Sequence, residues 1–464
     1  MTTVRTRFAP SPTGMIHLGN IRTAIYAWLY ARHNNGQFVL RIEDTDLERS
    51  TQAATDMILE SMDWLGLNYD EGPIYQTHRL DHYREIAEQL IEKGLAYRCY
   101  CSKERIDKLR EKQMINKEKP RYDSCCREKN LPTRDEPYVI RFKNPTKGIV
   151  EFIDQVQGHL SFQNTELDDL VIIRSDRYPT YNFSVVIDDN EMCITHVIRG
   201  ADHINNTPRQ INLFKALDAT PPTFAHLPLI LGNDGKLLSK RHGAVNVMQY
   251  RDEGFLPEAM INYLIRLGWS HGDQEIFSRQ EMIDLFDIKD VNKAAAAFDI
   301  NKLLWLNRHY IKTLDPLYVA QYLAHQMVKL NIDITDGPDL TQIVLAQRER
   351  CETMQEMAAK SRIYYEDEYA FAEDAKKHLN LEIVPVLKAL REQFNNLEDW
   401  TEEKLHEIIN TVAEQFGLKL GKVAQPLRVT LTGGTFSPPI DVTLKLVGKK
   451  RTLARLVKAI LFIA

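Results

Sequence analysis

The chain has 464 residues, of which 44% are hydrophobic and 27% are charged, and its formal net charge is −5. This length exceeds a single core, and this composition excludes a disordered or fibrous protein, so we expect several folded domains. No stretch approaches the ~18 apolar residues of a membrane span, and residues 1–7 lack the apolar run of a signal peptide, which predicts a cytoplasmic protein without membrane contact.

The first residues predict a β-α-β unit. An extended segment, residues 4–9, leads into the loop Pro10-Ser11-Pro12-Thr13-Gly14. Apolar residues then recur at helical spacing up to residues 34–36, and residues 38–42 have the composition of a strand. A parallel strand pair joined by a crossover helix predicts an open α/β sheet, which binds ligands at the carboxyl ends of its strands. The loop and residues 43–46 both lie at such ends.

The middle of the chain, from about residue 73 to residue 178, has an irregular pattern that we interpret as an inserted domain. Four of the six cysteines lie there, at Cys99, Cys101, Cys125 and Cys126. Clustered cysteines in a long chain without a disulfide framework favour metal binding over redox chemistry.

The later part of the chain changes from strand to helix patterns. Strand composition resumes near residues 195–200, and from about Gly254 onward amphipathic patterns such as residues 257–267 and 401–416 predict helices. Residues 417–464 contain nine Lys or Arg against the single acid Asp441. The chain therefore has a basic end suited to phosphates, although a solvated helix end would have the same composition.

Two glycine-flanked segments carry residues suited to phosphate chemistry. The first, RFAPSPTGMIHLGN at residues 7–20, places His17 at a predicted helix start, where backbone N–H groups attract anions. The second, GNDGKLLSKRHG at residues 232–243, holds three cations. The first segment could simply have a histidine near a helix start, and the second could be a solvated surface hairpin. Together, the two segments indicate phosphate chemistry more specifically than either does alone.

These two segments resemble the HIGH and KMSKS signatures of class I aminoacyl-tRNA synthetases. The stretches RFAPSPTG, RIEDTD, PTYNF, VIRGADHINNTPRQ and SKRHGAV, with residues 261–269, are similar to bacterial glutamyl-tRNA synthetase. GLKLGKVAQPLRVTLTG at residues 417–433 extends the match into the C-terminal part. The resemblance covers essentially the whole chain.

The resemblance implies an α/β fold with a Rossmann-type catalytic domain split by an acceptor-binding insertion, a stem-contact region and an α-helical anticodon-binding domain. The expected segments are residues 1–75 and 186–236 for the catalytic domain, 76–185 for the insertion, 237–322 for the stem-contact region with the KMSKS-like loop, and 323–464 for the anticodon-binding domain.

The implied activity is ATP-dependent activation of L-glutamate to glutamyl-adenylate and its transfer to the 3′-terminal ribose of tRNA-Glu. The alternative is a specialised or non-discriminating paralogue that charges tRNA-Gln. Because no protein nucleophile is needed, the enzyme contributes positioning and stabilisation of phosphate charge. We expect Mg²⁺ with the nucleotide, a requirement for tRNA before activation, and a monomer.

The resemblance also implies roles for individual residues. The expected catalytic residues are His17, which contacts the ATP phosphates, and Lys240, which stabilises the leaving pyrophosphate. The expected ATP-binding residues are Ser11, Thr13, Gly14, His17, Gly19, Asn20, Ser239, Lys240 and Arg241. The expected glutamate-binding residues are Arg7, Ala9, Ser11, Glu43, Tyr181 and Arg199. A planar guanidinium binds a carboxylate through two hydrogen bonds, which suits Arg7 to the substrate side chain.

Three positions depart from the family pattern. Asn20 replaces the second histidine of HIGH, Leu237 takes the first KMSKS position with Lys236 displaced by one residue, and Ala201 replaces an acid, leaving Asp202. These changes are the reason for keeping the paralogue alternative.

A zinc site in the insertion is a further expectation. Some family members have Cys-x-Cys, a 24-residue spacer and Cys-x-His, and Cys99, Cys101 and Cys126 match three of these ligands, with Glu128 in place of the histidine. Cys125 and Tyr122 lie close enough in sequence to substitute for Glu128 as the fourth ligand. Zinc accepts thiolate readily and carboxylate less often, and reduced cysteines without metal are the competing interpretation.

Other classes of protein fit the sequence less well. A glutaminyl-tRNA synthetase has a β-barrel anticodon region, whereas the C-terminal patterns here are helical. A relative that glutamylates a modified tRNA base lacks the C-terminal domain. A small-cofactor adenylyltransferase has no need of a basic helical C-terminus, and a non-enzymatic tRNA-binding protein would not need His17, Glu43 and Lys240.

Overall fold

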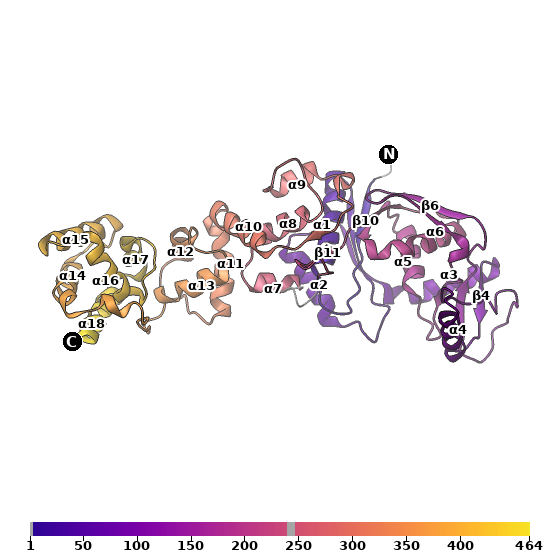
Figure 1. Ribbon diagram of the computed structural model, residues 1–464, viewed down its shortest axis with the longest axis horizontal. Coiled ribbons are helices and arrows are strands. Elements are labelled where there is room, and N and C mark those ends of the chain that lie inside the picture. The colour runs from indigo at the N-terminus through magenta and orange to yellow at the C-terminus, as the bar shows by residue number, and fades with distance from the viewer. Residues whose placement is uncertain (1–2, 239–245) are drawn as a thin grey trace. The chain divides into compact units, whose positions relative to one another are not determined.

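The computed structural model describes residues 3–238 and 246–464 (Figure 1). The chain forms two compact units, one made of Met1–Gln249 with Met260–Ile300 and the other of Tyr250–Ala259 with Asn301–Ala464. The three boundaries between the units fall inside α7 (Val247–Asp252), inside α8 (Pro257–Arg266) and after the first residue of α10 (Ile300–Thr313). Among the described residues, none of the helices combines the length and the apolar character that a bilayer crossing requires.

The centre of the first unit is a parallel sheet. Its strands are β1 (Arg5–Phe8), β2 (Gln37–Ile42), β3 (Glu71–Tyr75), β9 (His196–Gly200) and β10 (Thr223–Leu227). β2 pairs with β1 and β3, and β9 pairs with β10. The N–H of Thr195, just before β9, donates to the carbonyl of Arg5 at 3.0 Å, which joins the two groups in the order β3-β2-β1-β9-β10. This is a Rossmann-type order, and its direction reverses between β1 and β9.

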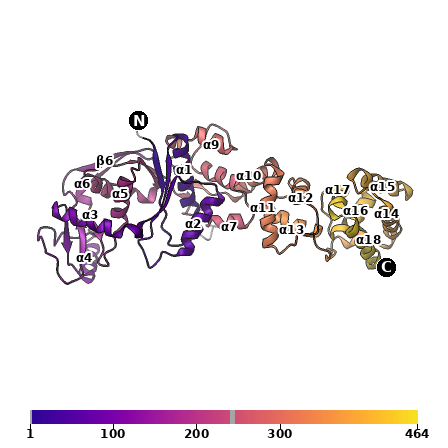
Figure 2. The same cartoon turned by 180° about the vertical axis from the view of Figure 1, so that it is seen from behind.

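Helices cover both faces of this sheet (Figures 1 and 2). α1 (Leu18–His33) lies on one face, where Thr6 donates to the carbonyl of Ala27. α5 (Tyr181–Glu191) and α6 (Thr207–Ala216) lie on the other, where Met192, just past α5, and Ile211 pack against Val39 and Val197. The other helices of this unit are α2 (Gln52–Trp64), α3 (Leu80–Glu92), α4 (Lys103–Ile115) and α9 (Arg279–Leu285), with short η1 (Gln76–Arg79), η2 (Asn164–Glu166), η3 (Ala201–Asn206) and η5 (Ile288–Asp290).

The segment between β3 and β9 forms smaller antiparallel sheets, in the region where the sequence predicts an insertion. β4 (Ala96–Cys99), β5 (Val139–Phe142) and β8 (Val171–Ile173) form one sheet, and β6 (Ile149–Asp154) and β7 (Gly158–Gln163) form a hairpin. β11 (Ile230–Leu231) and β12 (Ala296–Ala297) make a short parallel pair. The exact segment boundaries expected from the sequence stay a prediction.

The described residues of the second unit are helical, with no strand. Its helices are α10 (Ile300–Thr313), α11 (Pro316–Lys329), α12 (Leu340–Gln347), α13 (Met354–Ser361), α14 (Val384–Asn396), α15 (Glu402–Gln415), α16 (Leu420–Thr432), α17 (Ile440–Val447) and α18 (Lys449–Ile463), with η6 (Arg362–Tyr364), η7 (Lys376–His378) and η8 (Leu381–Ile383). The amphipathic segment 401–416 is α15, whose N-cap Thr401 accepts from the N–H of Lys404. The predicted α/β fold with a helical C-terminal part is therefore confirmed.

A cluster of buried charges attaches α5 to the sheet. We call Arg7, Arg41, Glu43, Asp188 and Asp189 the charged cluster, and all of them are buried. Asp189 Oδ1 accepts from Arg7 Nε at 3.2 Å and from Arg41 Nη1 at 2.8 Å, and Arg41 Nη2 donates to Glu43 Oε1 at 3.2 Å. Burial raises the pKa of Asp189, but the charges of Arg7 and Arg41 outweigh it and leave that pKa below its usual value.

Asp188 extends the charged cluster toward the elements that follow β3. Its carboxylate accepts from the Tyr83 hydroxyl at 2.9 Å and from Gln76 Nε2 at 2.8 Å, and it pairs with Arg79 Nε at 2.9 Å and Arg41 Nε at 3.6 Å. The two consecutive carboxylates on α5 therefore bind largely different partners. Asp189 balances the strand arginines, and Asp188 joins α5 to α3 and η1.

We expect Asp189→Asn to loosen this part of the first unit, because it leaves two buried guanidinium groups without their shared carboxylate. Removing one partner of a buried ion pair costs about 3–5 kcal/mol, which hydrogen exchange would report as faster exchange of α5, β1 and β2. Glu373→Gln, which removes the exposed pair with Lys376, is the control and should leave these rates unchanged. Equal exchange in both variants would contradict this role of Asp189.

Candidate active site

The loop after β1 lies at the carboxyl edge of the sheet, beside the point where the strand order reverses. The N–H of Glu43 donates to the carbonyl of Pro10 at 3.0 Å, which holds the ends of β1 and β2 together. The loop leads to His17, the extended N-cap residue of α1, whose side chain is exposed. A Cβ built on Gly14 or Gly19 would meet no atom within 4 Å. The start of α1 is therefore open to an anionic group.

The other expected ATP-binding residues divide between described and undescribed parts of the chain. Ser11, Thr13 and Asn20 are exposed on the same loop and the first turn of α1. Ser239, Lys240 and Arg241 lie outside the described residues. Just before them, Lys236 and Leu237 are exposed, and the carbonyl of Lys236 accepts from the N–H of Gly232 at 2.8 Å.

The expected glutamate-binding residues come from four different elements and meet on one face of the sheet. Arg7 on β1, Arg199 on β9 and Glu43 at the end of β2 are buried, and Tyr181 begins α5. Arg199 Nη1 donates to the Tyr181 hydroxyl at 3.4 Å. Burial raises the pKa of Tyr181, so its hydroxyl stays protonated and can donate. Ala9 directly follows β1, and Ser11 lies exposed two residues later.

Arg199 differs from the other buried arginines of this face because its partners are neutral. Its Nε donates to His226 Nε2 at 3.0 Å and its Nη2 to the Thr207 hydroxyl at 2.8 Å. Among the described residues, no carboxylate forms an ion pair with Arg199, whereas Arg7 and Arg41 share Asp189. Burial, with repulsion from Arg7, keeps the pKa of Arg199 below its usual value. A buried guanidinium without a counter-charge favours binding of an anion.

Several residues of this site were not predicted from the sequence. They are Arg41, Asp188 and Asp189 of the charged cluster, and His203, Thr207, His226 and Asp154 around Arg199 and Tyr181. His203 Nδ1 lies 3.1 Å from the Tyr181 hydroxyl, and burial, with the charge of Arg199, lowers the pKa of His203 to about 4. The alternation of strand side chains was the available signal, since Arg7, Arg41, Arg199 and His226 all face α5 and α6.

The segment that departs from the family at Ala201 begins the short helix η3. Ala201 is half-buried, and the neighbouring Asp202 pairs with His203 Nε2 at 3.5 Å. The Asp202 side chain is 62% exposed. Its carboxylate therefore faces solvent and does not pair with Arg199.

A cavity of about 630 Å³ adjoins the loop after β1. Its walls come from that loop, from the segments after β2 and β3, and from Tyr178. Asp44, which lines it, accepts from the N–H and hydroxyl of Thr77 at 2.9 and 2.6 Å. The cavity lies at the carboxyl edge of the sheet, where open α/β folds bind their ligands.

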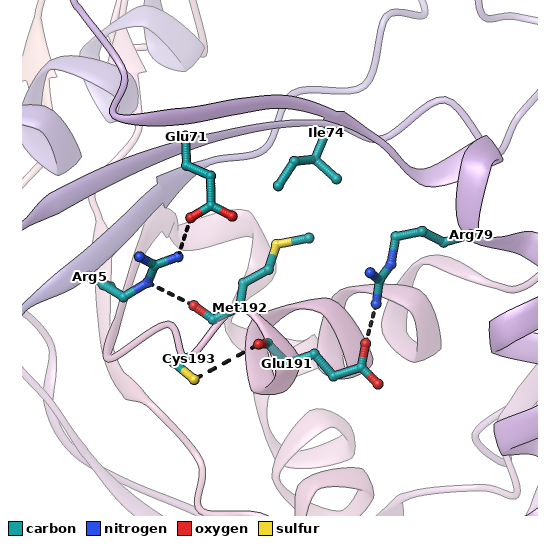
Figure 3. Close-up of a pocket in the computed structure, with 7 residues that line it drawn as sticks. All are labelled: Arg5, Glu71, Ile74, Arg79, Glu191, Met192 and Cys193. Carbon is teal, nitrogen blue, oxygen red and sulfur yellow. Dashed lines mark hydrogen bonds and ion pairs between the residues drawn. The ribbon is translucent and has the colours of Figure 1, made fainter.

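A second cavity, of about 370 Å³, lies among Arg5, Glu71, Ile74, Arg79 and the end of α5 (Figure 3). Arg5 pairs with Glu71 at 2.7 Å and Arg79 pairs with Glu191, so both cations already have counter-charges. Arg5 and Glu71 are the first residues of β1 and β3. This cavity is therefore lined in part by the amino ends of the strands and is a weaker candidate for the ligand site.

Three of the expected metal ligands lie together. The ligand atoms of Cys99, Cys101 and Cys126 are all within 4.8 Å of one another, and the Sγ atoms of Cys101 and Cys126 are 3.6 Å apart. The hydroxyl of Tyr122 lies 3.3 Å from Cys99 Sγ and 3.6 Å from Cys101 Sγ.

The two remaining metal candidates have other polar partners. The Glu128 side chain is 79% exposed and pairs with Arg127 and Lys143 at 3.4 and 3.5 Å. The thiol of Cys125 accepts from Lys129 Nζ at 3.6 Å. Neither belongs to the three-cysteine group. Cys125 is half-buried and packs against the same apolar cluster as the three cysteines, but its Sγ is not part of their group.

The basic end of the chain is partly engaged within the second unit. Arg455 is buried and donates to the carbonyls of Leu431, Ile363 and Glu366 at 2.6 to 2.7 Å. Arg451 pairs with Asp336 and Asp367 at 3.1 and 2.7 Å. Lys419, Lys422 and Lys450 are exposed and offer positive charge to solvent.

Two family models match the chain in the order that the fold suggests. The catalytic domain of class I tRNA synthetases (E and Q) matches residues 3–305, and an anticodon binding domain matches residues 316–460. The first match contains the parallel sheet and the site around Arg199. The second falls within the helical unit.

Individual relatives match over their whole length. The chain is 58% identical to the glutamate–tRNA ligase of Legionella pneumophila (strain Lens) over 99% of this chain and 98% of that protein. It is 57% identical to glutamate–tRNA ligase 1 of Coxiella burnetii (strain RSA 331 / Henzerling II) over 100% and 99%. A crystal structure of a glutamate tRNA ligase from Elizabethkingia meningosepticum in complex with its amino acid has a TM-score of 0.85 at 34% identity, covering 100% of both chains. With the Rossmann-type sheet, the loop around His17 and the helical second unit, these matches show that the chain belongs to the glutamate–tRNA ligases of class I.

Proposed function

We propose that this protein activates L-glutamate with ATP and transfers it to the 3′-terminal ribose of tRNA-Glu, releasing pyrophosphate and AMP. The observation that carries the amino-acid assignment is Arg199, a buried guanidinium with only neutral partners among the described residues. A substrate that brings its own side-chain carboxylate supplies the missing counter-charge. Glutamine cannot do this, and a site left with an unpaired buried charge rejects such an analogue strongly.

The glutamate groups are assigned by charge. Arg199 and Arg7 bind the side-chain carboxylate, and Tyr181 donates a hydrogen bond to it. Arg7 uses Nε and Nη2 for Asp189, which leaves Nη1 for the substrate. Glu43 pairs with the substrate amino group, and Ala9 and Ser11 border the site. The related Elizabethkingia enzyme, whose structure was determined in complex with its amino acid, supports an amino-acid site in this family.

The nucleotide is assigned to the loop after β1 and the start of α1. His17 contacts the phosphates, with Ser11, Thr13, Gly14, Gly19 and Asn20 around them and Ser239, Lys240 and Arg241 from the second signature. The substrate α-carboxylate attacks the α-phosphorus, the bond to pyrophosphate breaks, and the N–H groups and cations stabilise the negative charge of the leaving group. Mg²⁺ bound to the phosphates supplies further positive charge.

The transfer step needs the terminal ribose close to the adenylate. We assign the cavity lined by Asp44, Thr77 and Tyr178 to the 3′-terminal nucleotide, because it adjoins the loop where the adenylate forms. The ribose 2′-hydroxyl attacks the anhydride carbonyl carbon, and AMP leaves. In this assignment residues 76–185 bind the acceptor arm, residues 237–322 contact the stem, and residues 323–464 bind the anticodon of one tRNA per monomer.

Glutamate-dependent ATP–pyrophosphate exchange tests the function directly. We expect exchange with glutamate when a tRNA-Glu transcript is present, none with glutamine, and little without tRNA. Separate tRNA-Glu and tRNA-Gln transcripts in a charging assay identify the tRNA. Charging of tRNA-Gln at a similar rate would show the non-discriminating activity instead, and robust exchange without tRNA would contradict the ordered reaction.

Substitution of Arg199 tests the amino-acid site. We expect Arg199→Ala to lower kcat/KM for glutamate by roughly a hundredfold or more, because the substrate carboxylate loses a charge-assisted partner in a buried site. Arg7→Ala should have an effect of similar size, while the KM for ATP should change by less than about threefold in both variants. Arg5→Ala, which opens an exposed pair on the same strand, is the control. A change in glutamate kinetics no larger than that of the control would remove Arg199 from the site.

Zinc binding in the insertion is a separate proposal. Zn–S bonds of about 2.3 Å in a tetrahedron place the sulfur atoms about 3.8 Å apart, close to the 3.6 Å between Cys101 and Cys126. We assign Cys99, Cys101 and Cys126 as ligands and the Tyr122 oxygen as the fourth. Bound zinc would hold α4 and the segment around residue 122 against β4, a structural role distant from the chemistry at His17.

Metal analysis of protein purified without chelator should find about one zinc per chain. Cys101→Ser should lose it, whereas Cys125→Ser and Glu128→Gln should keep it, because the ligand atoms of those two residues are not part of the three-thiol group. Well under one zinc in the wild-type protein would remove the site. Loss of zinc in Glu128→Gln would restore the carboxylate as the fourth ligand.

A further inference from the structure

Behind Arg199 lies a chain of hydrogen bonds that connects it to two residues without an assigned role. Asp154 Oδ2 lies 2.6 Å from His226 Nδ1, and His226 Nε2 lies 3.0 Å from Arg199 Nε. Asp154, His226 and Arg199 are 1%, 0% and 5% exposed. His226 and Arg199 are register partners on β10 and β9, and Asp154 is the last residue of β6. Three separate strands thus build one buried array.

The chemistry of the two end groups permits one arrangement of the imidazole between them. A guanidinium has only donors, so His226 Nε2 must accept from Arg199. An ionised carboxylate only accepts, so His226 Nδ1 must carry the proton that it donates to Asp154. Burial, foremost, lowers the pKa of His226, which keeps the ring neutral. A proton on Nε2 would face the N–H of Arg199, and the Thr207 hydroxyl, which also lies 3.1 Å from Nε2, can donate to that nitrogen while it accepts from Arg199 Nη2.

The arrangement decides which edge of Arg199 remains for a ligand. Of its five N–H groups, one is used by His226, one by Tyr181 and one by Thr207. One N–H on Nη1 and one on Nη2 remain, and these two nitrogens together can bind a carboxylate through two hydrogen bonds. Because Nε is held by His226, the guanidinium cannot rotate to offer its other edge.

We propose that Asp154 and His226 are positioning residues for the amino-acid substrate: Asp154 fixes the His226 tautomer, and His226 in turn aims Arg199 at the substrate side-chain carboxylate. This inference rests on the assignment of Arg199 to glutamate. Through Asp154, the β6–β7 hairpin, which lies in the segment between β3 and β9, then helps to select the substrate that binds at the parallel sheet.

Asp154 also has a local structural role, carried by its other oxygen. Oδ1 accepts from the N–H groups of Val156 and Gln157 at 3.0 and 2.8 Å, which closes the turn between β6 and β7, and from the N–H of His226 at 3.1 Å. Only Oδ2 faces the imidazole. Asp154→Asn can therefore keep the turn through its amide oxygen while replacing Oδ2 with an NH₂ donor.

Asp154→Asn is the test because it reverses the tautomer. The amide NH₂ would donate to Nδ1, the proton would move to Nε2, and Nε2 would face Arg199 with a donor. We expect the KM for glutamate to rise by roughly tenfold or more in tRNA-saturated pyrophosphate exchange, with kcat and the KM for ATP within about twofold. Glu151→Gln, the same change at an exposed site of β6, is the matched control and should match wild type.

Variants of His226 separate positioning from simple packing. His226→Leu, which has no acceptor, should raise the KM for glutamate by roughly tenfold or more, and His226→Gln, which keeps an acceptor, should raise it less. Glutamine has no tautomers, so in the His226→Gln variant the further change Asp154→Asn should raise the KM for glutamate very little. If the two substitutions only disturbed packing independently, their effects on the KM for glutamate would add in the double variant.

The outcomes distinguish this inference from the proposed function. An unchanged glutamate KM in folded Asp154→Asn, or full additivity with His226→Gln, overturns the positioning role while the effect of Arg199→Ala stands. An unchanged glutamate KM in Arg199→Ala overturns the amino-acid assignment itself. If Asp154→Asn fails to fold, the two His226 variants decide, and equal KM values for Gln and Leu at this position overturn the inference.

Discussion

Burial of positive charge on one face of the sheet is the constraint around which this protein is built. β1, β2 and β9 each place an arginine on the side of α5, and a desolvated guanidinium needs hydrogen-bond partners and a counter-charge. Consecutive carboxylates on α5 meet most of this need, since Asp189 bridges Arg7 and Arg41 and Asp188 pairs with Arg41 as well. The position of α5 over the sheet, and with it Tyr181 at the start of that helix, follows from these ion pairs.

In the proposed assignment of the amino-acid site, the same constraint accounts for its selectivity. Arg199 lies on the same face but has only neutral partners among the described residues, so the array is complete only when a ligand contributes a carboxylate. Its neutral partners accept hydrogen bonds from its N–H groups but leave its positive charge uncompensated. A carboxylate in place of His226 would pair with Arg199 and remove the preference for an acidic substrate. A histidine held in one tautomer accepts a hydrogen bond and leaves the positive charge in place.

The sequence predicts which candidate residues lie together at this site better than it predicts the residues that hold them in place. Arg7, Glu43, Tyr181 and Arg199 lie in segments that resemble known signatures, and the structure brings them together. Asp189 is 182 residues from Arg7 and Asp154 is 72 residues from His226, and neither carries a local pattern that announces its partner. The open parallel sheet and the helical second unit follow from periodicity and are confirmed. Glu128 stands where some family members have a histidine, but its position in the chain does not determine whether the side chain points toward the three cysteines.

The hairpin β6–β7 links the segment between β3 and β9 directly to the parallel sheet. The N–H of Gln155 donates to the carbonyl of Phe224 on β10 at 2.9 Å, and Asp154 reaches His226 from the same turn. Residues that lie in the predicted tRNA-binding insertion therefore contribute to the environment of Arg199. Asp188 makes a second connection, to Tyr83 on α3 and Gln76 on η1. If this segment binds the acceptor arm, as proposed, its movement would act on the buried arginines at two points: on Arg41 through Asp188 and on Arg199 through His226.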